Sequence, residues 1–307
     1  MKSFTSLLAA TDFSIDGNNA VRRAALLAHE HGAYLKIAHV LEPAVCKLVR
    51  DWFTPAIGAD LEAAQARETL RCLAMEIAGR YDVEVAVEVM VGDPLENLLL
   101  ASQEFDLLVL GRRGHRRFPR LIVGRTVDRA TRLRRGPVLV VKTPAEGPYR
   151  QVLVPVDFTV SSDAALGLAA RVACIGGLHV FHAINSHGVA PLRGADVPED
   201  VVRATLLRQE AGALARIRRA AAKVGLDSTR LGVGAAHGHP VWATLGQARR
   251  VSADLIVAGK HGRSTLGDFL LGRVSRRLLA ESSCDILLVP RPRGERSCAG
   301  HAAMAAP

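Results

Sequence analysis

Apolar and polar residues alternate along the chain in short runs that predict strands and in longer stretches that predict helices. In the first half, β-rich apolar runs occur at 6–11, 34–41, 83–90, 106–110 and 137–142. Stretches with helical periodicity, such as 59–81, lie between them. Strands that alternate with crossover helices predict an α/β fold, with a parallel sheet and helices on both of its faces.

The same order of elements returns in the second half, because the chain contains an internal repeat. Residues 7–20 align with 152–165, and residues 105–129 align with 253–277. We therefore predict two tandem five-stranded, Rossmann-like domains, at 1–146 and at 147–292. Residues 293–307 lack periodicity and large apolar side chains, so we expect a disordered tail there.

Composition is consistent with two cores, since 307 residues at 49% hydrophobic content suffice for two domains of about 150 residues. The chain has no apolar stretch long enough to span a bilayer and no secretory cleavage site, so we expect a soluble cytoplasmic protein without membrane contact. Its isolated cysteines are interpreted as reduced thiols: Cys46, Cys72, Cys174, Cys284 and Cys298.

Positive charge is concentrated in one segment of a chain whose net charge is +10. Residues 112–135 contain Arg112, Arg113, Arg116, Arg117, Arg120, Arg125, Arg129, Arg132, Arg134 and Arg135. Such a run favours anionic ligands, although its simplest interpretation is a solvated face. Nucleic acid is not expected as a partner, because only 4% of the residues are aromatic and stacking on bases requires aromatic rings.

Ligands of open parallel sheets bind outside the carboxyl ends of the strands, so the loops there are the candidate site. Asp12 and Asp157 follow the first strand of each copy. Glycines follow the fourth strand at identical spacing, as Gly111, Gly114 and Gly124 in the first copy and Gly259, Gly262 and Gly272 in the second. The glycines serve either tight turns or close approach to a ligand, and the aspartates serve either as turn and cap residues or as partners of a ribose or adenine.

Other repeated residues are expected to be structural. Ser14 and Thr159 are predicted helix N-caps, and Pro94 and Pro240 are predicted first-turn residues. His39 and His182 occupy equivalent places and are interpreted as packing residues. His237 and His239 form a His-x-His pair, but no third ligand is recognisable, so a solvated loop is favoured over a metal site.

Each half of the chain resembles the universal stress protein family, over residues 4–143 and 150–291. The resemblance lies in a strand that ends in aspartate, a GxxG loop after a later strand, and a third glycine nine residues beyond that loop. The resemblance implies a pocket for ATP or another adenine nucleotide, with Mg²⁺ present only together with nucleotide. In the first copy the implied pocket consists of Asp12, Val40, Gly111, Gly114, Gly124, Arg125 and Thr126. In the second it consists of Asp157, Ala183, Gly259, Gly262, Gly272, Arg273 and Val274.

Both copies depart from the family pattern at the residue after the third glycine, where Arg125 and Arg273 replace a serine or threonine. An arginine there either binds phosphate through its planar fork of donors or fills the phosphate site. Thr126 favours the first copy as the nucleotide site, because Val274 lacks a hydroxyl. The second copy's GKHG loop is closer to the family, and on balance it is slightly favoured.

Two functions follow from the sequence. The first is a stress-response module that binds adenine nucleotide in at least one pocket and acts through conformation or partners. The alternative is a protein-interaction module that retains the fold without binding nucleotide, because of Arg125 and Arg273. No enzyme is predicted, since phosphate-loop and nucleotidyl-transfer motifs are missing, although slow ATP hydrolysis stays open. The two copies are expected to pack as an intramolecular pseudo-dimer. The resemblance to the family implies that their fifth strands lie near this contact.

Overall fold

The computed structural model describes residues 4–42, 57–114, 123–173, 176–185, 198–226, 231–262 and 271–292, with only the backbone for 57–60. The first half comprises β1 (Ser6–Ala10), α1 (Ile15–His31), β2 (Tyr34–Leu41), α3 (Ile57–Tyr81), β3 (Val85–Val91), α4 (Pro94–Ala101), the 3-10 helix η1 (Ser102–Glu104), β4 (Leu107–Gly111), α5 (Arg125–Leu133) and β5 (Val138–Val141). The second half comprises β6 (Gln151–Pro155), α6 (Val160–Val172), β7 (Gly177–Ile184), α8 (Glu199–Lys223), β8 (Leu231–His237), α9 (Pro240–Arg250), β9 (Leu255–Gly259), α10 (Arg273–Glu281) and β10 (Asp285–Val289).

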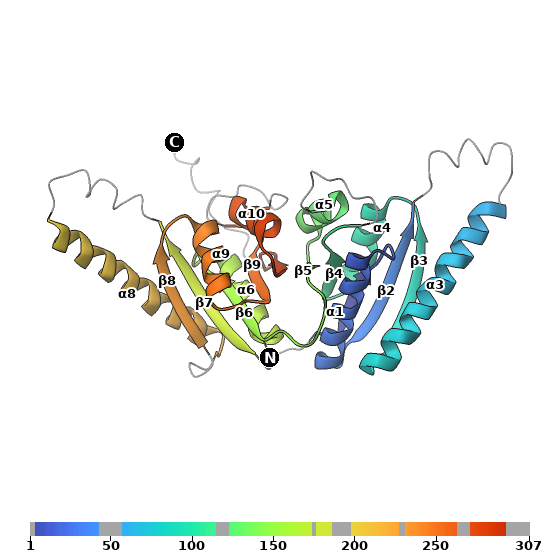
Figure 1. Cartoon of the computed structure of the whole chain (residues 1–307), viewed down its shortest axis with the longest axis horizontal. Coiled ribbons are helices and arrows are strands. Elements are labelled where there is room, and N and C mark those ends of the chain that lie inside the picture. Colours follow the sequence, from blue (N-terminus) through green and yellow to red (C-terminus); the bar gives the residue numbers. More distant parts are fainter. Residues whose placement is uncertain are drawn as a thin grey trace, which may run out of the picture.

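The ten strands formed by the described residues make one continuous sheet, in the order β3-β2-β1-β4-β5-β10-β9-β6-β7-β8. Neighbouring strands are parallel within each half, whereas β5 and β10 are antiparallel and place Val140 opposite Ile286. The predicted tandem α/β architecture is confirmed, and so is the expected contact between the fifth strands. The two halves therefore lie side by side on one shared sheet (Figure 1).

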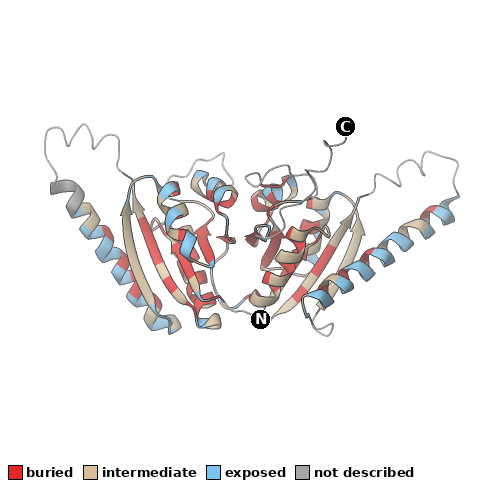
Figure 2. Cartoon of the chain, turned by 180° about the vertical axis from the view of Figure 1, so that it is seen from behind, coloured by how far each residue is buried: buried red, intermediate tan, exposed pale blue. Residues whose placement is uncertain are grey.

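Helices cover both faces of this sheet, and each face has its own core. Buried side chains of α1, α3, α6 and α8 pack on one face, and those of α4, α5, α9 and α10 pack on the other. The central strands are buried, because helices cover them on both sides. Figure 2 shows that α3 and α8 at the two ends expose their outer surfaces.

The predicted helix-start signals are present in both halves. Ser14 accepts a hydrogen bond from the Gly17 amide at the start of α1, and Thr159 forms a capping box with Ser162 at the start of α6. Pro94 and Pro240 lie in the first turns of α4 and α9. Local hydrogen bonding thus fixes where the chain turns from each first strand into its helix.

A buried carboxylate, Asp285, joins the two halves at the start of β10. Its Oδ2 accepts a hydrogen bond from the Tyr149 hydroxyl at 2.7 Å, and its Oδ1 accepts one from the Lys142 amide at 2.8 Å. Arg23 of α1 lies 3.6 Å from Asp285, covers the Tyr149 ring at 4.1 Å and donates to the Gly147 carbonyl. The connection between β5 and β6 is therefore held against residues of both halves.

The structure bears in part on the predictions about membrane-spanning segments, cysteines and the C-terminal tail. Across the described residues, no helix is both long and apolar enough to span a bilayer. Cys72 is exposed and Cys284 is buried, and both are free thiols as expected. Cys46, Cys174, Cys298 and the predicted tail at 293–307 lie outside the described residues.

Candidate functional site

The loop after the first strand of each half has the same strained conformation. Phe13 and Phe158 adopt φ angles of 63° and 61°, which are uncommon for residues other than glycine. Each phenylalanine packs on a histidine of the second strand, with ring centroids 4.4 Å apart for His39 and 4.5 Å for His182. The Nδ1 atoms of His39 and His182 donate to the carbonyls of Thr11 and Val156, so their predicted packing role is confirmed.

The strained loop holds the predicted aspartate in place. Asp12 accepts hydrogen bonds from the backbone amide and hydroxyl of Ser14, the latter at 2.5 Å. Asp157 accepts the same pair from Thr159, with the hydroxyl at 2.6 Å. One oxygen of each carboxylate is thereby engaged in an Asx turn, so the predicted turn role is present in both copies.

The glycine loop after the fourth strand packs tightly against this turn. A Cβ added to Gly111 would lie 2.4 Å from the Asp16 carbonyl oxygen, and one added to Gly114 would lie 2.5 Å from Asp12 Oδ2. Gly124 donates its amide to the Arg112 carbonyl and forms the N-cap of α5, and Gly272 makes the equivalent bond to Lys260 before α10. Close packing against backbone thus requires Gly111, whereas a side chain at Gly114 would have to displace the Asp12 carboxylate. The same loop brings the start of α5 to the cavity that Asp12 lines.

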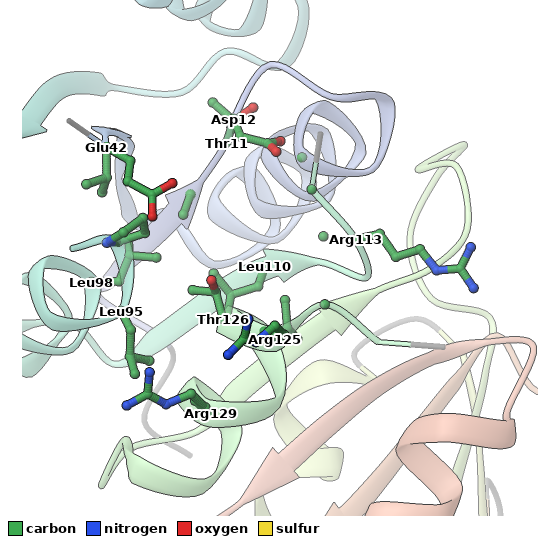
Figure 3. Close-up of a pocket in the computed structure, with 18 of the residues that line it drawn as sticks. Thr11, Asp12, Glu42, Leu95, Leu98, Leu110, Arg113, Arg125, Thr126 and Arg129 are labelled. Carbon is green, nitrogen blue, oxygen red and sulfur yellow. The ribbon is translucent and has the colours of Figure 1, made fainter. Parts of the chain in front are cut away.

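A cavity of about 540 Å³ opens at this point in the first half, within the usual size range of small-molecule sites. All seven residues predicted for the first pocket line it: Asp12, Val40, Gly111, Gly114, Gly124, Arg125 and Thr126. In Figure 3, Asp12 lies on one side of the cavity, and Arg125 and Thr126 lie across from it at the start of α5.

The wall of the cavity is divided between apolar and charged residues. Its apolar part consists of Ala10, Ala38, Val40, Leu95, Leu98, Leu110 and Val127, from the sheet and from the adjoining helices α4 and α5. Its basic part comes from Arg113 in the loop after β4 and from α5, where the exposed side chains of Arg125 and Arg129 flank the helix start. Gly124 forms the N-cap of α5 and has no side chain that could accept hydrogen bonds from the amides of the first turn.

Several lining residues were not predicted from the sequence: Thr11, Gly17, Glu42, Asp93, Pro94, Leu95, Leu98, Leu110, Arg113, Val127 and Arg129. Arg113 and Arg129 lie in the arginine run, and Figure 3 shows the guanidinium of Arg113 pointing away from the other labelled residues. Asp93 caps α4 by accepting from the Glu96 amide, and its place just beyond the end of β3 is a usable signal. Glu42 follows the second strand in the same way.

The second half places its predicted residues in equivalent elements. Asp157 follows β6, Ala183 lies in β7, Gly259 ends β9, Gly272 precedes α10, and Arg273 and Val274 begin α10. A Cβ added to Gly262 would lie 3.3 Å from Asp157 Oδ2, which is a looser fit than at Gly114. Residues 263–270 of this loop lie outside the described residues, so the loop is only partly in view.

The interpretation of the arginine run as a solvated face is wrong for Arg134. This residue is only 5% exposed, and its guanidinium donates to the carbonyls of Ser102, Phe105 and Pro137. The side chain thus links the end of α5 to η1 and to the residues that precede β4 and β5, and burial lowers its pKa to about 10. Arg116, Arg117 and Arg120 lie outside the described residues.

The His-x-His pair shows no metal-binding arrangement. His237 Nε2 lies 3.4 Å from the Leu206 carbonyl and 3.8 Å from Glu210 on α8. The described part of the chain contains no group of three or more histidine, cysteine, aspartate or glutamate side chains that could hold a metal ion.

The chain matches the model of the universal stress protein family twice, at residues 3–142 and 148–290. It is 26% identical to a universal stress protein of Mycolicibacterium smegmatis over 300 residues, and this alignment covers 94% of this chain and 97% of the relative. A solved universal stress protein of Archaeoglobus fulgidus has a TM-score of 0.68 at 21% identity and covers 94% of this chain and 98% of its own. A universal stress protein solved in complex with cAMP is 26% identical, with a TM-score of 0.34, and covers 48% of this chain and 100% of its own. The chain therefore belongs to the universal stress protein family, as a tandem of two of its domains.

Proposed function

We propose that the chain is a stress-response module that binds an adenine nucleotide in the cavity of its first half. The observation that carries this proposal is the composition of the cavity wall, which has an apolar part, the carboxylates of Asp12, Glu42 and Asp93, and a basic helix start around one space of about 540 Å³. A nucleotide carries matching groups, namely a flat base, ribose hydroxyls and phosphates.

The base and the ribose fit the part of the cavity that faces the sheet. Ala38, Val40 and Leu98 offer apolar surface to a purine, and Val40 also offers backbone groups at the end of β2. The Asp12 carboxylate lies beside this surface and is fixed by Ser14, so it can accept hydrogen bonds from ribose hydroxyls. A carboxylate held by its own turn binds without first losing side-chain freedom.

The phosphates fit the basic helix start. Arg125 lines the cavity while its side chain remains exposed, so its guanidinium can meet phosphate at the rim instead of occupying the space. Arg129 lies one helical turn further along the same side, and the first amides of α5 add the anion preference of a helix N-terminus. Thr126 supplies a hydroxyl in the same place, and Mg²⁺ would enter with the nucleotide.

Preference for the first half differs from the sequence-based preference for the second. It rests on Gly114, which fits closely against Asp12, and on Thr126, for which the second half has Val274. We propose binding rather than turnover as the activity, with the signal passed on by conformation or by partner proteins.

Isothermal titration of the full chain with ATP tests the proposal. We expect saturable binding of about one nucleotide per chain, with or without Mg²⁺, and competition by AMP or cAMP at the same site. We expect a binding free energy between about −4 and −8 kcal/mol, which corresponds to a dissociation constant between about 1 mM and 1 μM. No saturable heat at millimolar ATP would instead favour the protein-interaction module that retains only the fold.

A further inference from the structure

Lys260 is a buried lysine of the second half whose side chain reaches into the first. It follows Gly259 at the end of β9 and is 2% exposed. Its ammonium donates to the Arg134 carbonyl at 2.6 Å and to the Gly136 carbonyl at 3.3 Å. Both acceptors belong to the turn that joins α5 to β5.

The backbone of Lys260 is held as firmly as its side chain. Its amide donates to the Val289 carbonyl at the end of β10, and its carbonyl accepts from the Gly272 amide at the start of α10. The ammonium is therefore supported by three elements of the second half. Because its backbone is fixed, the Lys260 side chain restrains the turn that its ammonium contacts.

The turn that Lys260 holds is the far end of the helix that forms the basic part of the first cavity. α5 is nine residues long, so about 13 Å separates its two ends. The cavity is lined by Arg125, Thr126 and Arg129, which lie at or near the start of α5, whereas Arg134 is the C-cap of the same helix. The Arg134 guanidinium ties the same end to Ser102 and Phe105 in the first half.

We propose that Lys260 is a positioning residue for the nucleotide cavity of the first half, because it fixes the C-terminal end of α5 from the second half. This inference rests on the proposed nucleotide site for its effect on affinity. Loss of the ammonium would leave two carbonyls without their donor and would free the end of α5 to shift. A short helix moves as one body, so the arginines at its start would shift as well.

Lys142 provides a matched control, because it is a lysine of the first half that contacts the end of a helix in the second half. Lys142 follows β5 in the first half, and its ammonium donates to the carbonyls of Leu279 and Ser282 at the end of α10. It therefore holds the second half's last helix and lines no part of the first cavity. Burial lowers the pKa of Lys260 to about 7 and that of Lys142 to about 8, so the two side chains are comparable in environment.

The test compares Lys260→Met with Lys142→Met by site-resolved hydrogen exchange of the full chain, without nucleotide and across an ATP titration. Without ATP, we expect faster exchange of the α5 amides in Lys260→Met and of the α10 amides in Lys142→Met. The ATP concentration that protects α5 should rise by about threefold to thirtyfold in Lys260→Met and should stay within about twofold of wild type in Lys142→Met. Exchange is followed at α5, whose first residues line the first cavity, and separately at α10, which begins at the equivalent place in the second half.

Equal effects of the two variants on α5, or wild-type exchange and affinity in Lys260→Met, would overturn the inference. If Lys260→Met does not fold, Lys260→Gln carries the same comparison, because its amide retains two donors at a shorter reach. A wild-type chain that shows no ATP-dependent protection would contradict the proposed function instead. In that case the exchange of α5 without nucleotide still decides whether Lys260 positions the helix.

Discussion

Replacement of Asp285 by alanine is expected to lower the free energy of unfolding by about 3–5 kcal/mol, the usual cost of breaking a buried charged pair. Asp285 is fully buried and accepts hydrogen bonds from the Tyr149 hydroxyl and from the amides of Lys142 and Thr143. The Arg23 guanidinium 3.6 Å away has a side chain that is only 6% exposed. Without Asp285, this cation and the hydroxyl would remain buried with fewer partners.

Urea unfolding of the variant measures this loss, with Asp128→Ala as the control. Asp128 forms an ion pair with Arg132 within α5, and both side chains are about one third exposed. An exposed pair of this kind contributes at most about 1 kcal/mol. Comparable losses in the two variants would show that the Asp285 network does not join the two halves as described.

Replacement of Arg125 by glutamate is expected to weaken ATP binding by about tenfold or more, since a repulsive charge would replace an attractive one beside the phosphates. Arg125 lines the first cavity at the uncapped start of α5. The matched variant is Arg273→Glu, which makes the same change at the equivalent start of α10. We expect it to change the affinity by less than about twofold, as measured by isothermal titration.

The two ways in which an arginine can act at this position predict opposite results. If Arg125 binds phosphate, its reversal weakens binding of ATP more than binding of AMP, because ATP carries more charge. Tighter binding of ATP by Arg125→Glu would show that the arginine obstructs the phosphate site. A larger effect of Arg273→Glu than of Arg125→Glu would move the site to the second half.

Much of the fold could be predicted because the internal repeat shows the pattern of each strand and helix in both halves of the sequence. Apolar runs place β2 at its observed bounds and the other strands of the first half within two residues of theirs. Ser14 and Thr159 mark the starts of α1 and α6, since a cap acts on amides only a few residues away. The resemblance to the universal stress protein family implied the seven predicted residues of the first cavity, all of which line it, although their role as ligands remains a proposal.

The remaining features depend on contacts between residues far apart in the sequence. Arg23 and Gly147 are 124 positions apart, and Tyr149 and Asp285 are 136 apart, so no local pattern indicates either pair. Arg134 was grouped with its exposed neighbours because a run of like charges carries no information about which member turns inward. The strained Phe13 and Phe158 were likewise missed, because the histidine partners that stabilise them lie on another strand.

The most direct test of the central claim is a crystal structure of the full chain grown with millimolar ATP and Mg²⁺. The account predicts nucleotide density in the first half, with the base against Val40 and Leu98, the ribose beside Asp12 and the phosphates at the start of α5 next to Arg125. An empty first cavity at that concentration, or nucleotide bound only in the second half, would contradict it.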